Sequence, residues 1–155
     1  QESTIRGLIK EKQITNIYLI PSVPRNELLE KYEEADILFL QLKDIKMFEK
    51  TIPSKIFEYL ASQKPIIYGV EGVAKTILKE EFNRKYYFKA NDIEDLIGTF
   101  QNLIKAIEEN NYVKPDLEVL INNYSRKKLS MRYADKIEEL CEESYGIFKE
   151  SNQIL

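Results

Sequence analysis

The chain has 155 residues, with 23 basic and 26 acidic side chains and a net charge of −3. This length fits one domain or a large piece of one, and the mildly acidic charge does not indicate a nucleic-acid surface. The absence of histidine excludes a His-centred triad and a His-ligated metal within this chain. The single cysteine, Cys141, excludes an internal disulfide and favours a reducing compartment. No apolar run is long enough for a membrane helix, and a start at Gln1 suggests a segment of something longer.

Helices and strands alternate in the first third of the chain. Apolar residues at helical spacing predict a helix over residues 4–12. The β-branched and aromatic run over residues 16–20, ended by a proline, predicts a strand. Asn26 is expected to cap a helix to residue 35, and the continuous apolar run over residues 37–40 predicts a strand buried on both faces. The expected inward side chains of the two helices are Ile5, Leu8, Ile9, Leu28, Leu29 and Tyr32.

The middle of the chain continues the alternation. A loop over residues 41–51 precedes a helix over residues 53–62, where a proline suits the first turn. Residues 65–69 predict a buried strand, and two glycines bracket a tight loop before a helix over residues 73–80. Residues 86–88 predict a short strand. The core side chains expected here are Ile56, Phe57, Leu60, Tyr86, Tyr87 and Phe88.

Two helices are expected in the last third. Asn91 or Asp92 caps a long amphipathic helix with Ile93, Leu96, Ile97, Phe100, Ile104 and Ile107 on one face. After a linker over residues 110–115 and a short helical turn over residues 117–121, Ser125 caps the final helix. The side chains expected along one side of this helix are Leu129, Tyr133, Ile137, Leu140, Cys141 and Phe148, with Cys141 as inert core.

The short alternation of strands and helices predicts an α/β fold, a parallel sheet covered by helices, with a long C-terminal helix. Ligands of such sheets bind beyond the carboxyl ends of the strands, so the loops after Ile20, Leu40 and Gly69 are the candidates. We expect the sheet and its helices to form one domain over residues 1–123, and the C-terminal helix over residues 124–155 to pack on this domain or toward a domain outside these residues.

The helix that begins at Pro53 is the strongest candidate for a binding site. A helix start just beyond a strand presents free N–H groups and a partial positive charge, which suits an anion. Ser54 adds a hydroxyl and Lys55 a cation, and Glu58, one turn along, can accept hydrogen bonds from a vicinal diol. The alternative is that Ser54 is only a cap, Lys55 is solvated and Glu58 lies on a wet helix face.

Three blocks of the sequence resemble the C-terminal half of GT-B glycosyltransferases of the large group 1 (family 4) kind. Residues 16–24 are similar to the family's N-V-x-F-x-G-x-V, and residues 28–37 to its L-x-x-x-Y-x-x-A-D-V. Residues 52–67 are similar to P-x-K-x-x-E-Y-x-A-x-G-K-P-V, the most specific block. The resemblance covers essentially the whole chain and implies a partial Rossmann-like, nucleotide-sugar-binding domain.

The resemblance implies a domain that holds a nucleotide-diphosphate sugar, most often a UDP-sugar. Ser54 and Lys55 match positions whose backbone amides hold the diphosphate, and Glu58 matches the second Glu of the family's E-x7-E motif, which binds the ribose hydroxyls. Ser22 and Val23 occupy the loop that usually borders the base. No metal and no cofactor are expected, since Asp-x-Asp is absent from the sequence.

The sequence departs from the family at several positions. Lys50 stands where the first Glu of the motif would contact the donor sugar, and Glu49, one place away, can replace it only if the loop shifts. Gln63 stands at a turn where the family has a glycine and where a positive φ is often needed, and Pro21 replaces another glycine. The sugar specificity is therefore open.

The family's acceptor-binding N-terminal domain and the first two strands of its donor domain have no counterpart in these residues. The predicted sheet would lack its middle, so we expect residues 17–20 to pair with residues 37–40, or exposed edges to pair with another copy. We expect no glycosyl transfer by the isolated chain.

The prediction is the donor-binding part of a hexosyltransferase-type enzyme of bacterial capsule, O-antigen or exopolysaccharide synthesis. The expected location is the cytoplasm, with the parent enzyme peripheral at the inner membrane as one possibility. Alternatives are a non-catalytic nucleotide-sugar-binding subunit of a two-chain transferase, a fragment of a GT-B-fold sugar-nucleotide epimerase, and a receiver-like interaction module. No nucleic-acid partner is expected.

Three charged groups have simpler explanations than catalysis. The acidic residues that begin the long helix, Asp92, Glu94 and Asp95, suit the helix dipole. A second group, Lys43, Lys46 and Lys50, either lines a phosphate approach or is a solvated loop. The basic end of the final helix, Arg126, Lys127, Lys128 and Arg132, is expected to be solvated, with an interdomain or membrane contact as alternatives.

Overall fold

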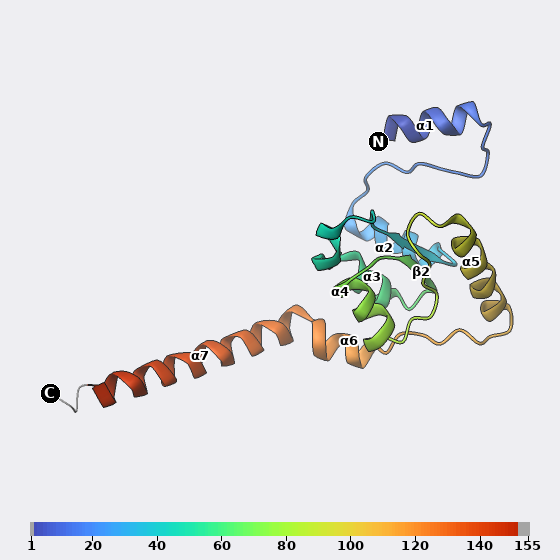
Figure 1. Cartoon of the computed structure of the whole chain (residues 1–155). Coiled ribbons are helices and arrows are strands. Elements are labelled where there is room, and N and C mark those ends of the chain that lie inside the picture. Colours follow the sequence, from blue (N-terminus) through green and yellow to red (C-terminus); the bar gives the residue numbers. More distant parts are fainter. Residues whose placement is uncertain (1, 152–155) are drawn as a thin grey trace. The chain divides into compact units, whose positions relative to one another are not determined.

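The computed structural model describes the backbone of residues 2–151 and the side chains of residues 2–142 (Figure 1). Gln1 and the side chain of Phe148 lie outside the described residues. The chain divides into two compact units, one up to Lys31 and one from Tyr32 onward, and each is described here by itself.

The first unit begins with a helix and continues without regular structure. Helix α1 (Glu2–Glu11) confirms the helix predicted over residues 4–12, although none of its residues is buried. The strand predicted over residues 16–20 is wrong, and its predicted pairing with residues 37–40 falls with it. Within the described part of the chain, residues 15–23 make no backbone hydrogen bond, and Tyr18 is 82% exposed. A strand needs a neighbour to satisfy its backbone, and the apolar pattern alone supplies none.

Helix α2 (Arg25–Glu34) joins the two units. It confirms the predicted helix, and Tyr32 is buried as expected. Leu28 is half-buried, but Leu29, which was expected to face inward, is exposed. The last turn of α2 belongs to the second unit, where the Tyr32 ring meets the Tyr59 ring edge-on at 5.3 Å between centroids.

The second unit is built on a small parallel sheet of α/β character. Strands β1 (Leu38–Gln41) and β2 (Ile66–Gly69) pair in parallel, with Leu38 opposite Ile66 and Gln41 opposite Gly69. Tyr87 forms a single parallel bridge to Tyr68 on the other side of β2, so residues 86–88 add one bridge to the sheet where a strand was predicted. Both predicted strands, 37–40 and 65–69, are therefore confirmed to within a residue or two.

β1 is buried on one face only, which corrects the prediction of two buried faces. Leu38 and Leu40 are buried, but Phe39 is 48% exposed. The Leu38 amide donates to the Pro65 carbonyl, just before β2, at 2.7 Å, and the Leu42 amide donates to the Gly69 carbonyl at 3.2 Å. Successive amides of a strand point to opposite sides, so the amide of Phe39 points to the unpaired edge of β1. Phe39 stacks on Phe88, 5.5 Å between ring centroids, but no further strand covers its outer side in the described chain.

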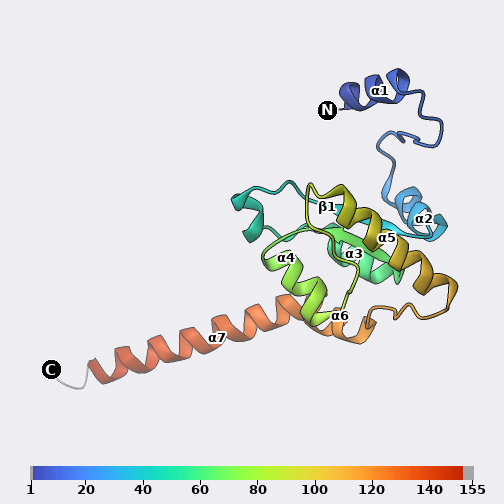
Figure 2. The same ribbon diagram turned by 45° about the vertical axis from the view of Figure 1, so that its right-hand side comes forward.

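Helical segments make up the rest of the regular structure of the second unit (Figure 2). They are η1 (Lys46–Lys50), α3 (Lys55–Ser62), α4 (Val73–Thr76), η2 (Ile77–Glu81), α5 (Ile93–Glu108), α6 (Leu117–Tyr124) and α7 (Arg126–Ser151). The predicted helices of this half are thus confirmed as elements, and the loop predicted over residues 41–51 contains the short η1 helix. Ile56 and Leu60 of α3 are fully buried, while Phe57, expected in the core, is half-buried.

α5 packs on the sheet through a narrower face than its sequence predicts. Its fully buried residue is Leu103, which joins Ile67 and Phe88 in one cluster with Leu96 and Ile107 at the margin. Ile93, Ile97 and Phe100 of the predicted face are exposed, and Ile104 is half-buried. Among the described residues, the sheet is only two strands and one bridge wide, so it covers only part of the apolar side of α5.

The C-terminal helix α7 follows α6 closely. α6 ends at Tyr124, whose ring lies 4.8 Å from the Phe57 ring centroid, and the Lys128 amide donates to the Ser125 hydroxyl at 3.4 Å, which confirms Ser125 as a cap. Cys141 is exposed, so its assignment to the core is wrong. The domain boundary predicted after residue 123 stays a prediction. Among the described helices, none has the length and apolar character to cross a membrane.

Candidate functional site

The start of α3 carries the predicted site residues Pro53, Ser54 and Lys55. The carbonyls of Pro53 and Ser54 accept the amides of Ile56 and Phe57 at 3.0 and 3.1 Å, which closes the first turn. Ser54 has helical dihedrals, φ −57° and ψ −27°, and its side chain makes no capping hydrogen bond. Ser54 is therefore not a side-chain cap, which was the simpler explanation of its position.

Two backbone N–H groups at this helix start have no acceptor among the described residues. Within the described chain, the backbone amides of Ser54 and Lys55 make no hydrogen bond, and both side chains are exposed. The first N–H groups of a helix carry the positive end of its dipole and bind anions. The start of α3 is thus chemically able to receive a phosphate group, with the Lys55 cation beside it.

Glu58 lies in the first turn of α3 and is half-buried. Its Oε2 accepts a hydrogen bond from the Tyr32 hydroxyl at 3.2 Å, so the end of α2 orients this carboxylate. Burial, with the negative charge of Glu58 as a second cause, raises the pKa of the adjacent Tyr59. Glu58 is therefore a positioned carboxylate one turn from the open helix start, and the prediction of a fully wet helix face does not hold for it.

Glu49 and Lys50, which the resemblance predicts beside a donor sugar, lie in η1 and are both exposed. η1 packs against the loop after β2, where Gly72 has φ +63°. A cavity of about 10 Å³ between these loops is lined by residues that include Lys43, Asp44, Glu49 and Glu71. A cavity of this size accommodates about one water molecule.

The other predicted residues are placed as follows. Ser22, exposed, and Val23, half-buried, lie in the irregular segment of the first unit, and their expected place beside a base stays a prediction. Lys43 and Lys46 are exposed, as a solvated loop requires. Asp92 caps α5 by accepting the Asp95 amide at 3.0 Å, which confirms its capping role. Gln63 has φ +56°, so the expected left-handed turn is present.

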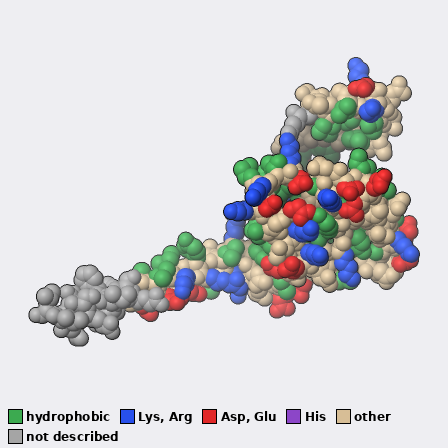
Figure 3. All heavy atoms as spheres, viewed as in Figure 1, with side chains coloured by type: hydrophobic (Ala, Val, Ile, Leu, Met, Phe, Trp, Pro, Cys, Tyr) green, Lys and Arg blue, Asp and Glu red, His purple; other side chains and the backbone are tan. Residues whose placement is uncertain are grey.

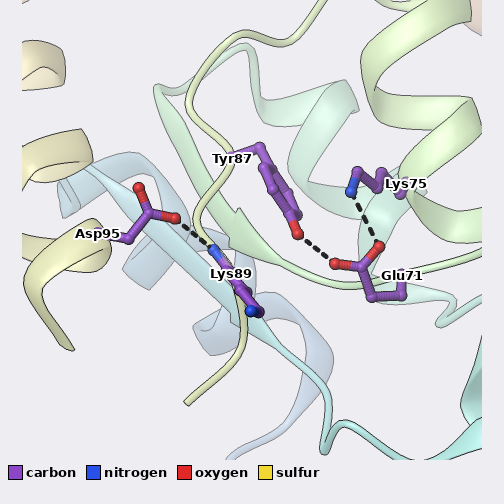
Figure 4. Close-up of polar contacts among 5 residues, drawn as sticks. All are labelled: Glu71, Lys75, Tyr87, Lys89 and Asp95. Carbon is purple, nitrogen blue, oxygen red and sulfur yellow. Dashed lines mark hydrogen bonds and ion pairs between the residues drawn. The ribbon is translucent and has the colours of Figure 1, made fainter. Parts of the chain in front are cut away.

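A polar cluster that the sequence analysis did not identify lies at the carboxyl end of the sheet (Figure 4). Glu71 stands between two partners: Lys75 Nζ lies 2.9 Å from its Oε2, and the Tyr87 hydroxyl donates to its Oε1. Lys75 Nζ also lies 3.8 Å from the centre of the Tyr87 ring. The Lys89 amide, two residues further, donates to Asp95 Oδ2 at 2.7 Å and ties this segment to α5.

Glu71, Lys75 and Tyr87 shift one another's pKa values. Partial burial acts to raise the pKa of Glu71, but hydrogen bonds from Tyr87 and Lys75 and the Lys75 charge lower it overall. Burial and the hydrogen bond to Glu71 raise the pKa of Tyr87. The i,i+4 spacing of Glu71 and Lys75 after a strand was the signal for the ion pair, whereas nothing local links Tyr87 to it.

Comparisons with models of protein families, with curated proteins and with solved structures found no match.

Proposed function

We propose that this chain is the donor-binding part of a glycosyltransferase that uses a nucleotide-diphosphate sugar, most often a UDP-sugar. One observation carries the proposal: the Glu58 carboxylate is half-buried and held by Tyr32, one turn from a helix start whose Ser54 and Lys55 amides make no hydrogen bond within the described chain. An anion-binding helix start next to an oriented carboxylate suits a ligand that carries both a phosphate and a vicinal diol.

In this proposal, the diphosphate binds the amides of Ser54 and Lys55, and the Lys55 ammonium adds a point charge. Pro53 fixes the backbone before the first turn. Glu58 accepts hydrogen bonds from the ribose hydroxyls, and Glu49 and Lys50 face the donor sugar. The surrounding sheet is then a partial Rossmann-like domain.

The parent enzyme would join an acceptor hydroxyl to the anomeric carbon while the bond from that carbon to the nucleoside diphosphate breaks. The helix dipole and cations stabilise the departing diphosphate without a metal. The acceptor-binding groups come from outside these residues, so the isolated chain does not transfer sugar. The setting proposed is bacterial surface-polysaccharide synthesis in the cytoplasm, with the parent enzyme at the inner face of the membrane as the alternative location.

The narrow sheet favours a second candidate of the same binding chemistry. Its two strands leave Phe39 half-exposed at an open edge, which suits a non-catalytic subunit whose partner chain completes the sheet and the site. The two candidates differ in whether the remaining strands are joined to this chain covalently, and both require the same nucleotide site.

Calorimetric titration of UDP into the chain tests the site. Glu58→Ala removes charge-assisted hydrogen bonds to the ribose, so binding should weaken about tenfold to a hundredfold. Glu108→Ala is the matched control, because Glu108 is an exposed helical carboxylate on α5. Equal binding by the wild type and the Glu58 variant would refute the assignment of Glu58, and no binding by either would refute a nucleotide site in this chain.

A further inference from the structure

Helix α7 carries an apolar stripe that nothing in the described chain covers. Leu129, Tyr133 and Ile137 follow one another at intervals of four residues, and each is about half or more exposed. They line a shallow hollow on the helix together with Ser130 and Ala134. Figure 3 shows apolar side chains along α7 between charged groups. Such a stripe on a helix in water indicates a surface for another element.

The charges of α7 are separated along its length. Residues 126–132 contain four basic and no acidic side chains. Residues 135–142 contain four acidic side chains against one lysine, Lys136, which already pairs with Glu139 at 2.7 Å. One half of the exposed helix is therefore positive and the other negative, on either side of the middle of the stripe.

We propose that α7 pairs with α7 of a second copy of this chain in an antiparallel helix dimer. Antiparallel packing places the two apolar stripes face to face and sets the basic half of each helix opposite the acidic half of the other. A parallel pair would place like charges together in both halves. An anionic membrane would attract the first half and repel the second, so the charge pattern favours a second copy.

Two hydrogen bonds tie the first turns of α7 to the end of α6. Arg132 Nη2 donates to the Asn122 carbonyl at 3.0 Å, and the Ser125 hydroxyl accepts the Lys128 amide. These contacts hold the basic half of α7 to the end of α6. In the dimer, each α7 is therefore held at its first turns by its own copy of the chain. The proposal of a dimer does not depend on the proposed function.

Sedimentation equilibrium of the full chain over a range of concentrations tests the pairing. Ile137→Lys places a charge in the stripe and should raise the dissociation constant of the dimer at least tenfold. Met131→Lys is the matched control, since Met131 is 52% exposed and Ile137 50%, but Met131 lies on another side of the same helix. It should leave the dissociation constant unchanged. A wild type that is monomeric at millimolar concentration, or equal effects of the two variants, would overturn the proposal.

Cys141 reports the direction of pairing. Parallel pairing would bring the two Cys141 side chains together, whereas antiparallel pairing centred on Tyr133 places each Cys141 opposite residue 125, about 24 Å along the helix from the other cysteine. With oxidised glutathione as the oxidant, the wild type should therefore give no disulfide-linked dimer on a non-reducing gel. A disulfide-linked dimer of the wild type would show parallel pairing and overturn the proposal. Binding to anionic lipid vesicles without self-association would also overturn it.

Discussion

The backbone carbonyl of Glu49 lies directly over Gly72, at the place where any other residue would carry its Cβ. Gly72 also has φ +63°, a left-handed conformation that side chains other than glycine rarely adopt. This close approach, which only glycine allows, packs η1 against the loop after β2. It therefore joins the two loops that follow the strands of the sheet, which is where the ligands of parallel sheets bind.

Gly72→Ala should therefore lower the free energy of unfolding by about 3 kcal/mol, because the new methyl group meets backbone and not a movable side chain. Urea denaturation measures this loss. Gly98→Ala is the control, since a Cβ at Gly98 meets no atom within 4 Å in the middle of α5. It should raise stability by up to about 1 kcal/mol. Equal behaviour of the two variants would contradict the packing of η1.

Gln63→Gly should stabilise the protein by roughly 0.5–1 kcal/mol, because Gln63 ends α3 in a left-handed conformation that costs glycine little. Gln101→Gly, at an exposed position inside α5, should cost about 1 kcal/mol. Opposite signs for the same chemical change test whether the backbone dihedral is the cause. A loss of stability in both variants would show that the side chain of Gln63 stabilises the protein by more than its left-handed backbone conformation costs.

Tyr87→Phe should raise the pKa of Glu71, since it removes the hydroxyl that donates to this carboxylate. NMR titration of the side-chain carboxyl measures the change, and Tyr86→Phe, the adjacent half-buried tyrosine, is the control. In the wild type, the pKa of Glu71 is lower in the folded chain than in the unfolded one. Its contribution to stability is therefore present above the unfolded pKa and lost as pH falls through the folded pKa. A pKa unmoved by Tyr87→Phe would contradict the hydrogen bond.

Arg84→Met should destabilise the protein by about 3 kcal/mol. Arg84 is 5% exposed, and its guanidinium donates to the carbonyls of Phe82 and Val113 at 2.6 and 2.5 Å and to the Tyr112 hydroxyl at 3.2 Å. Removal of the guanidinium leaves these acceptors without a donor in a buried place. Lys85→Met, at the exposed neighbouring position, should change stability by less than about 0.5 kcal/mol in the same thermal or urea titration.

Local patterns predicted the elements whose partners lie close in the sequence. The spacing of Ile56 and Leu60 predicted α3, and Asp92 predicted the start of α5. The failures have a common physical cause. Residues 16–20 have the composition of a strand but no backbone partner in the described chain, and β1, which carries Phe39, has a partner strand on one side only in that part of the chain. Whether a segment forms a strand, and how far that strand is buried, depends on the segments that pack beside it, and the periodicity of its own residues carries no information about those segments.

In the candidate site, too, the relations between residues close in the sequence could be predicted, and the long-range contacts could not. The spacing of Ser54, Lys55 and Glu58 within one helical turn was readable from the sequence, because a helix fixes those relations locally. The contact of Tyr32 with Glu58, across 26 residues, and that of Tyr87 with Glu71, across 16, depend on how the elements pack. Sequence reasoning therefore named the carboxylate of the site but not the hydroxyl that orients it.

The buried guanidinium of Arg84 also affects how the segment after α5 responds to acid and to salt. Its hydrogen-bond acceptors are carbonyls and one hydroxyl, which neither gain nor lose protons as conditions turn acidic. Buried charges are also little screened by added electrolyte. The hydrogen bonds of Arg84 to residues 112–114 are therefore expected to survive added salt, whereas exposed ion pairs such as that of Arg6 with Glu2 weaken in it.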